Sequence, residues 1–469
     1  MEKSKKNILI LFLLLFSFTF VSNAQIKDVP VVKIFEKNYY KYDVRHRETL
    51  YSICKKFNVT EAEILSMNPF IINGLKANQT LMIPVKITKI SNDKEIIIGK
   101  NNSKGKRKKS ANIAVDMPRI TLILPFTQEA DAGTNDKYIE FYEGFLLAVD
   151  SLKSLGFSFE VQALESGTNT EFINNAIVTG KLKETDYCIG GVTPEQVSML
   201  SKWAKKNQRM FIVPFSSNVS ELDSNPYIVQ TITPRDYMYD RLVDHIAGQL
   251  DESNIVFLNA GADNSDFQTK LIPQLKSKLG KKGIPFSEIA DDEDLLDLNK
   301  VLKDTKNNYI IPSTESVNKT NQIISRLSTY QIAHPEKKIS LLGQPDWQAM
   351  NKSFLKRLYE LDTYIYSNFY ADYQQQDVRN FQIQYTQNFG KNLLSNYPKY
   401  GMMGYDLAAY FIPRMVLEKS DSMEKALSIS PLQNDFLFNA KTRTGGSYNK
   451  VFYIIHYTRN NTVELIPLK

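Results

Sequence analysis

Hydrophobic residues beyond position 119 form short continuous runs, which are separated by stripes at helical spacing. The runs have the length and composition of strands buried on both faces of a sheet: ITLILPF (120–126), YCIGG (187–191), MFIVPF (210–215), NIVFLNA (254–260), NYIIPS (308–313) and ISLLG (339–343). The first stripe places its apolar residues on one helical face: Tyr138, Tyr142, Phe145, Val149 and Leu152. Strands that alternate with helices predict parallel sheets covered by helices on both faces.

The alternation runs through two series. We therefore expect an α/β fold with two lobes over residues 119–469, each built on a doubly wound parallel sheet. We place the first lobe at approximately 119–232 plus 366–420, and the second at approximately 233–365 plus 421–469. The stretch 450–466 contains two β-rich runs around a short polar break, which predicts a closing antiparallel ribbon.

Residues 39–85 predict a separate, smaller βααβ unit. Apolar and polar residues alternate over 40–44, as in a half-buried strand, and a helical stripe follows over 50–57. A capping box at 60–63 begins a second helix, which ends before Pro69. A short strand over 81–84 closes the unit.

Residues 1–24 have the parts of a secretory signal peptide. Three lysines precede an apolar run of 14 residues (8–21), and small residues at Ser22 and Ala24 suit a signal peptidase. A membrane-spanning helix needs about 20 apolar residues, so we favour cleavage after Ala24 over a retained anchor. The mature chain is then expected in the periplasm or cell envelope, and not integral to a membrane.

Residues 86–118 predict a basic, flexible linker. Six basic residues and no acid fall within positions 100–109. Such a segment is either a patch for an anionic polymer or membrane surface, or a solvated spacer, and we favour the spacer.

The composition limits the classes of protein to which the chain can belong. The chain has 469 residues, 42% of them hydrophobic, with 58 basic and 51 acidic side chains, which excludes a mostly disordered or collagen-like protein. A net charge of +7 is too small to indicate nucleic acid as a partner. The only two cysteines, Cys54 and Cys188, lie in different predicted units, so we expect isolated thiols.

The small unit resembles a lysin motif (LysM) domain over YDVRHRETLYSICKKFNVTEAEILSMNPFIINGLKANQTLMIP (42–84). The resemblance rests on the Y-x-V strand, the T-L before the first helix, the V-T before the second, the N-P and the Q-x-L-x-I-P end. Arg47 and Glu48 stand where the family usually has Gly-Asp.

The LysM resemblance implies binding of polymers that contain N-acetylglucosamine. In a bacterium this polymer is expected to be peptidoglycan. By position, two loops would line the groove, with Glu48, Thr49 and Leu50 in the first and Asn68, Pro69, Phe70, Ile71 and Ile72 in the second. Backbone amides and a hydroxyl suit an acetamido group, and an apolar loop suits its methyl. The alternative is a LysM without sugar affinity that acts as a spacer or a protein contact.

The long unit resembles type I periplasmic binding proteins, the fold of many ABC transporter substrate-binding proteins. The resemblance rests on the order of segments such as ITLILPF with EFYEGFLLAVD, CIGGVTPEQ, FIVPFSSNVSEL and YGMMGYDLAAYF. It implies a ligand between the lobes, at the carboxyl ends of the strands. The positions that match are Thr193, Ser216 and Ser217 in the first lobe, and Phe267 and Asp346 in the second.

Hydroxyls and helix N-termini would take a carboxylate, and Asp346 an ammonium group, which suits an amino acid. The alternative is an empty or closed cleft in which these residues are caps and turn formers.

We expect a binding protein and not an enzyme. The four histidines are scattered, and the chain has no H-E-x-x-H, G-x-S-x-G, P-loop or G-x-G-x-x-G motif. We therefore predict no catalytic residue, no metal site and no cofactor.

Three functions fit these expectations. The first is a peptidoglycan-bound protein whose two-lobed part senses a small, amino-acid-like ligand or scaffolds a cell-wall protein. The second is the solute-binding component of an ABC transporter for an amino acid or similar solute. The third is a regulator of peptidoglycan synthesis that uses no ligand, as do some outer-membrane lipoproteins with the type I binding fold.

Overall fold

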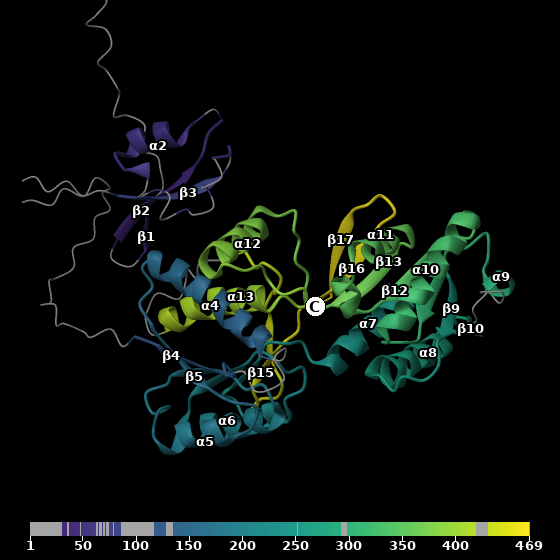
Figure 1. Ribbon diagram of the computed structural model, residues 1–469, viewed down its shortest axis with the longest axis horizontal. Coiled ribbons are helices and arrows are strands. Elements are labelled where there is room, and N and C mark those ends of the chain that lie inside the picture. Colours follow the sequence, from purple (N-terminus) through teal and green to yellow (C-terminus); the bar gives the residue numbers. More distant parts are fainter. Residues whose placement is uncertain are drawn as a thin grey trace, which may run out of the picture. The chain divides into compact units, whose positions relative to one another are not determined.

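The computed structural model describes residues 31–34, 37–46, 48–61, 64, 68, 71, 75–77, 79–85, 117–127, 135–250, 252–291, 298–418 and 430–468. The chain divides into an N-terminal unit and a larger second unit, which are described separately below (Figure 1). The predicted signal peptide (1–24) and residues 86–116 of the predicted linker lie outside the described residues.

The N-terminal unit is a three-stranded antiparallel sheet that carries a helix. Strand β2 (Lys37–Asp43) lies between β1 (Val31–Ile34) and β3 (Thr80–Pro84), and α2 (Leu50–Phe57) buries Ile53 and Phe57 in the core of the unit. The predicted strands at both ends and the first helix are confirmed, while β1 is an addition that the pattern did not predict. In the predicted second helix, Ile64 N donates to Thr60 O (3.1 Å), which is helical spacing.

The first lobe of the second unit is a seven-stranded sheet with the order β14-β15-β8-β7-β6-β4-β5. Its strands are β4 (Arg119–Leu124), β5 (Glu160–Glu165), β6 (Tyr187–Gly190), β7 (Met210–Val213), β8 (Ile228–Gln230), β14 (Phe438–Ala440) and β15 (Ser447–Asn449). The helices of this lobe are α4 (Asp136–Ser154), α5 (Glu171–Val178), α6 (Pro194–Asn207), η3 (Ser220–Asp223), α12 (Gln376–Phe389) and α13 (Tyr400–Glu418). β4 to β8 are parallel, and their order reverses beside β4, as in a doubly wound sheet.

The second lobe repeats this plan, with the order β10-β9-β11-β12-β13-β16-β17. Its strands are β9 (Asn254–Asn259), β10 (Phe286–Ala290), β11 (Asn308–Pro312), β12 (Ile339–Gly343), β13 (Thr363–Ser367), β16 (Phe452–Tyr457) and β17 (Val463–Leu468). Its helices are α7 (Arg235–Gln249), η4 (Phe267–Leu271), α8 (Ile272–Lys281), α9 (Leu298–Val301), α10 (Val317–Ala333), η5 (Pro345–Ala349) and α11 (Lys352–Glu360). Apolar residues of α7 and α8 fill one face of the sheet, and those of α10 and α11 fill the other. The fold is therefore α/β with two doubly wound sheets, and β16 and β17 form the predicted antiparallel ribbon.

One boundary of the lobes differs from the expectation. We placed all of 421–469 in the second lobe, but β14 and β15 join the first sheet, where β15 pairs with β8. These strands have three residues each and little hydrophobic patterning, so no local pattern indicates the crossing. The chain enters the second lobe again only after residue 449, where Thr233 Oγ1 donates to Val451 O (2.6 Å).

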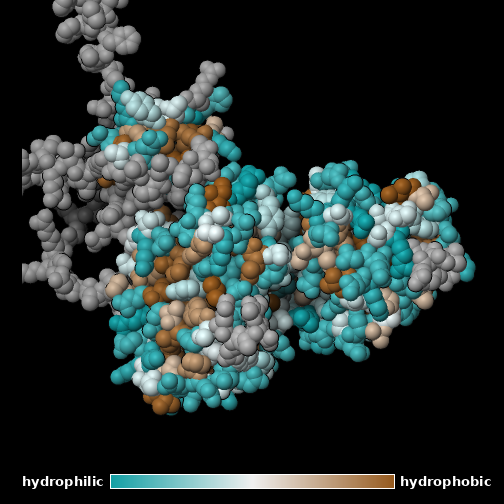
Figure 2. All heavy atoms as spheres, in the orientation of Figure 1, coloured by the Kyte–Doolittle hydropathy of each residue, from teal (hydrophilic) through white to brown (hydrophobic). Residues whose placement is uncertain are grey.

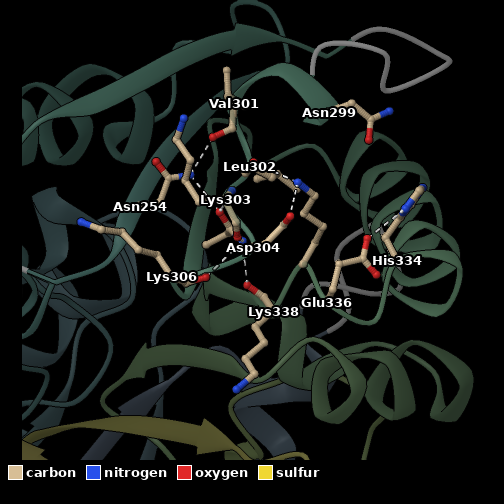
Figure 3. A network of polar contacts seen from close by, with 12 residues as sticks. Asn254, Asn299, Val301, Leu302, Lys303, Asp304, Lys306, His334, Glu336 and Lys338 are labelled. Atoms are coloured by element: carbon tan, nitrogen blue, oxygen red, sulfur yellow. Dashed lines mark hydrogen bonds and ion pairs between the residues drawn. The ribbon is translucent and has the colours of Figure 1, made fainter.

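The N-terminal edge of the second sheet is held by a polar network around the buried Asn308. Figure 3 shows its partners Asn254, Lys303 and Lys338 close together. The amide nitrogen of Asn308 donates to the carbonyl oxygens of Lys303 (2.9 Å) and Lys338 (3.1 Å), and its amide oxygen accepts from Asn254 Nδ2 (2.8 Å). One side chain thereby satisfies backbone carbonyls ahead of β11 and β12 and binds the side chain of the first residue of β9. Because the strands are parallel, the opposite edge collects the loops that carry the candidate ligand residues.

Candidate functional site

The first candidate loop of the N-terminal unit is fixed by Glu48. Its carboxylate accepts from Tyr42 Oη (2.6 and 2.7 Å), from the Arg45 backbone N (2.8 Å) and from Lys56 Nζ (3.4 Å). Burial raises the pKa of Glu48, but these hydrogen bonds outweigh burial and the net pKa is lowered. Glu48 is therefore ionised and engaged within the protein, and it braces the loop.

Thr49 has an equally local role. It is the N-cap of α2: its hydroxyl accepts from Ser52 N (3.2 Å), and Ser52 Oγ accepts from Thr49 N (2.9 Å). Leu50 is half-buried and packs against the core of the unit. The side chain after it, Tyr51, is 77% exposed, which makes it the most accessible apolar group on α2.

The second candidate loop is described only in part. Asn68 is buried and donates its amide to Ile64 O (2.8 Å), and Ile71 is buried in the core. Their side chains support the loop and do not face solvent. Pro69, Phe70 and Ile72 lie outside the described residues, as does Arg47.

In the first lobe, the order of strands reverses between β4 and β6, where doubly wound sheets commonly bind ligands. Glu165, at the end of β5, fixes the loop after β4 by accepting from Phe126 N (3.0 Å), Thr127 N (2.8 Å) and Thr127 Oγ1 (2.6 Å). These donors lower the pKa of Glu165 against the effect of burial. No local sequence motif marks Glu165, so we did not predict it.

The hydroxyls predicted in the first lobe stand at this edge. Thr193 caps α6 by accepting from Gln196 N (3.3 Å), and Ser216 Oγ donates to Asn218 O (2.7 Å) in the turn after β7. Ser217 is half-buried beside it. Two of the three predicted hydroxyls thus already serve local structure.

Beside the turn after β7 lies an aromatic cluster that the sequence analysis did not single out. Phe215 packs against Tyr138 (ring centroids 5.0 Å apart) and stacks on Tyr400 (6.0 Å). Lys137 Nζ lies 5.0 Å from the Tyr138 ring and 5.8 Å from the Tyr400 ring. The cluster joins the N-termini of α4 and α13 to the end of β7, and it supplies a cation over aromatic faces.

The matching edge of the second lobe is rich in carboxylates. Asp263 lies in the loop after β9, and its carboxylate accepts from Glu315 N (2.6 Å) in the loop after β11. Arg235, at the start of α7, pairs with Asp266 (2.6 Å). Asp346, in the helical turn η5 after β12, lies close enough for the charge of Arg235 to oppose the rise that burial causes in its pKa.

Burial by surrounding protein raises the pKa of both Asp346 and Glu315, although both side chains are exposed to solvent. For Glu315, Arg235 opposes the rise, and the negative charges of Asp263 and Asp346 add to it. Asp266, Glu315 and Asp346 act on the guanidinium of Arg235, and Asp266 also pairs with Lys270 (3.3 Å). A further cationic group would stabilise the ionised forms of Glu315 and Asp346.

Phe267 requires a correction. We expected it to contact a ligand, but it is fully buried in the core of the second lobe, where its ring is nearly parallel to that of Tyr366 (centroids 6.4 Å apart). It begins the π-helical turn η4, which continues directly into α8 and directs the ring inward. Position relative to a strand end did not reveal which way this side chain faces.

The residues that the structure describes contain no group of three or more His, Cys, Asp or Glu side chains placed to hold a metal ion. None of their helices is both long enough and apolar enough to cross a bilayer.

Residues 42–84 match the family model of the LysM domain. Residues 42–84 form a LysM domain. The match begins at Tyr42 and ends at Pro84, the limits of the motif in the sequence. No curated protein matches the chain as a whole.

Solved structures match the second unit. A putative branched-chain amino acid ABC transporter protein from Rhodospirillum rubrum is 11% identical, with a TM-score of 0.53, over 75% of this chain and 100% of its own. An ABC transporter substrate-binding protein from Desulfitobacterium hafniense in complex with Leu is 14% identical (75% and 100% covered, TM-score 0.44). LpoA of Haemophilus influenzae is 10% identical (75% and 58% covered, TM-score 0.49). The second unit therefore has the type I periplasmic binding protein fold.

Proposed function

We propose that this protein is exported, docks on peptidoglycan through its LysM domain, and uses its two-lobed unit to sense a small ligand that carries an ammonium group. The LysM match over residues 42–84 carries the first half of the proposal. The signal-like residues 1–24 support export. Doubly wound sheets commonly bind ligands at the carboxyl ends of their strands, which supports a ligand there.

The sugar-binding half can be tested with soluble N-acetylglucosamine oligomers titrated into the purified chain. Phe70→Ala removes an apolar side chain from the predicted groove, so we expect it to weaken binding at least fivefold. Lys55→Ala changes an exposed residue of α2 and is the matched control. Equal affinities for the two variants would show that the groove lies elsewhere.

The carboxylates around Arg235 support the ligand half. A ligand ammonium group would place a positive charge beside Asp346 and Glu315, whose crowding disfavours their ionised forms. The helix N-terminus behind Thr193 and the turn at Ser217 would take a carboxylate. An amino acid or the peptide part of a wall fragment has both groups.

Thermal unfolding against amino acids, short peptides and muropeptides tests this assignment. A ligand at a hundred times its dissociation constant stabilises the folded state by about 2.7 kcal/mol, which raises the midpoint. We expect Asp346→Ala to abolish the shift and Asp244→Ala, on the exposed face of α7, to preserve it. A shift that survives Asp346→Ala would contradict the assignment.

A second candidate is a wall-bound scaffold or synthesis regulator that uses no ligand. It is favoured by the local roles of Thr193 and Ser216 and by the burial of Phe267. The thermal panel separates the candidates, because a scaffold gives no shift with any small molecule.

A further inference from the structure

The first lobe carries a groove of about 790 Å³ between α5 and α6, on the face of the sheet that these helices cover. It begins at Thr170 and Glu195, near the strand end that holds Thr193, and runs along α6 to Asn207. In Figure 2, apolar residues appear over the part of the lobe where Figure 1 places these helices. Val178, which follows the lining residue Ile177, is 76% exposed and extends this apolar surface.

The groove is long and follows α6. Its lining residues on α6 run from Glu195 to Asn207, and those on one stripe, Met199, Lys202, Trp203 and Lys206, are three or four positions apart. With a rise of 1.5 Å per residue, the stretch from 195 to 207 is about 18 Å long. This length fits three turns of a helix or a short extended segment, and it exceeds a single amino acid or sugar.

The floor and the rim differ in chemistry. Ile177, Leu182, Met199 and Trp203 contribute apolar surface, and Trp203 is 7% exposed. Three lysines stand around them at positions 183, 202 and 206, against one acid among the lining residues, Glu195.

The charge of the rim is largely uncompensated. Lys202 lies near Glu221, whose pKa its charge helps to lower. Lys183 and Lys206 form no ion pair with any residue that the structure describes. Both are toward the C-terminal end of α6, whereas Glu195 is at its N-terminal end, so the positive charge is concentrated at one end of the groove.

We propose that this groove binds an acidic, amphipathic segment of a partner protein, whose apolar side chains pack on Trp203 and Met199 and whose carboxylates meet Lys183 and Lys206. Because the floor of the groove is apolar, the bound segment needs apolar side chains as well as negative charge. The lysines select against basic or neutral helices. The inference does not depend on the LysM domain or on a ligand at the strand ends.

Tryptophan fluorescence gives a direct readout, because the chain has only two tryptophans and the other, Trp347, is buried in the second lobe. In the purified chain with Trp347→Phe, Trp203 is the only tryptophan, and excitation at a wavelength that tyrosine does not absorb isolates its emission. The probe is a synthetic tryptophan-free peptide with leucines at helical spacing and glutamates between them. We expect a saturable change in emission. If Trp347→Phe unfolds, the unaltered chain is titrated and Trp203→Phe supplies the blank.

The variants assign the signal to the groove. Lys183→Glu with Lys206→Glu should weaken binding at least tenfold. The control is Lys181→Glu with Lys205→Glu, which makes the same charge change at neighbouring positions outside the groove. Lys205, like Lys206, lies in the last turn of α6. This control should weaken peptide binding less than threefold at about 0.15 M salt.

Three results would overturn the proposal. The first is the absence of a saturable change in tryptophan emission up to about 1 mM peptide. The second is an equal loss of peptide affinity in the two double variants. The third is equal affinity for a peptide whose leucines are replaced by serine. The last would identify a general polyanion site in place of a peptide groove.

Discussion

Glu48, which we expect to line the sugar groove, also holds its loop in place. Its carboxylate joins strand β2 to helix α2 through Tyr42 and Lys56. The pKa of Glu48 is lowered in the folded state, so its contribution to stability is present above the unfolded pKa of about 4.3 and is lost as the pH falls through the folded value.

We therefore expect amide exchange across residues 42–57 to accelerate below about pH 4 in the unaltered chain, beyond the intrinsic effect of pH. Glu48→Gln cannot ionise, so its exchange should be faster at pH 7 and should change less on acidification. Mass spectrometry of exchanged peptides makes the measurement. Parallel pH profiles for the two proteins would contradict this role.

Asp406 of α13 provides a second pH-dependent contact. It is buried and accepts from the backbone N of Leu432 (2.7 Å), Gln433 (2.9 Å) and Asn434 (2.8 Å). Burial raises its pKa to about 7 although the three donors oppose the rise. The folded state therefore holds the proton more tightly than the unfolded state, and the group costs stability as the pH rises from about 4 to about 7.

Denaturant unfolding of the unaltered chain should show this loss between pH 5 and pH 7, and Asp406→Asn should remove that part of the pH dependence. Asn also presents one oxygen fewer to three donors, which costs about 1–3 kcal/mol at pH 5. An unchanged pH slope in the variant would show that Asp406 does not titrate in this range.

The residues of the candidate site were only partly predictable. Thr193, Ser217 and Asp346 stand at strand ends as the order of segments indicated. Glu165, Lys137 and the Phe215 cluster depend on contacts between distant segments, and the sequence has no local pattern for them. Whether a residue near a strand end faces solvent or the core, as with Phe267, also depends on such contacts.

At the scale of elements, helices α4 and α13 approach so closely that their glycines are required. A Cβ at Gly144 would lie 1.8 Å from Gly401 O, and one at Gly404 would lie 1.9 Å from Phe141 O. Backbone atoms cannot yield as a flexible side chain does, so the helices would have to separate.

Gly404→Ala should therefore lower the free energy of unfolding by about 1–3 kcal/mol or more. Gly248→Ala, in α7, is the control: its Cβ meets nothing within 4 Å, so it should be neutral or stabilising by up to about 1 kcal/mol. Chemical denaturation of both variants measures the difference. Equal effects would show that the crossing tolerates a methyl group.

The order of elements was largely predictable, because each buried strand is a continuous apolar run and each helix has a stripe. The strands that the sequence pattern did not predict are short. β14 and β15 have three residues each, and their place in the first sheet depends on pairing with β8, more than 200 positions earlier. Local patterning has no means to indicate such a pairing.

At the scale of the whole molecule, two units with different tasks share one chain. In the proposed function the LysM domain provides the attachment, and the type I binding fold provides two sheets whose strand ends carry polar and charged side chains. Weak binding by a single LysM is sufficient if the wall offers many sites close together. The basic segment at 100–109 is the main competing explanation for any attachment to an anionic wall.

Sedimentation with insoluble peptidoglycan tests the central claim most directly. Three proteins are compared at low salt and at about 0.1 M salt, where the Debye length is about 10 Å: the chain from residue 25, the same chain without residues 31–85, and the chain with the basic residues of 104–109 changed to glutamine. We predict that the first and third sediment at both salt concentrations and that the second stays in solution. Sedimentation of the second protein, or loss of sedimentation in the third, would contradict attachment through the LysM domain.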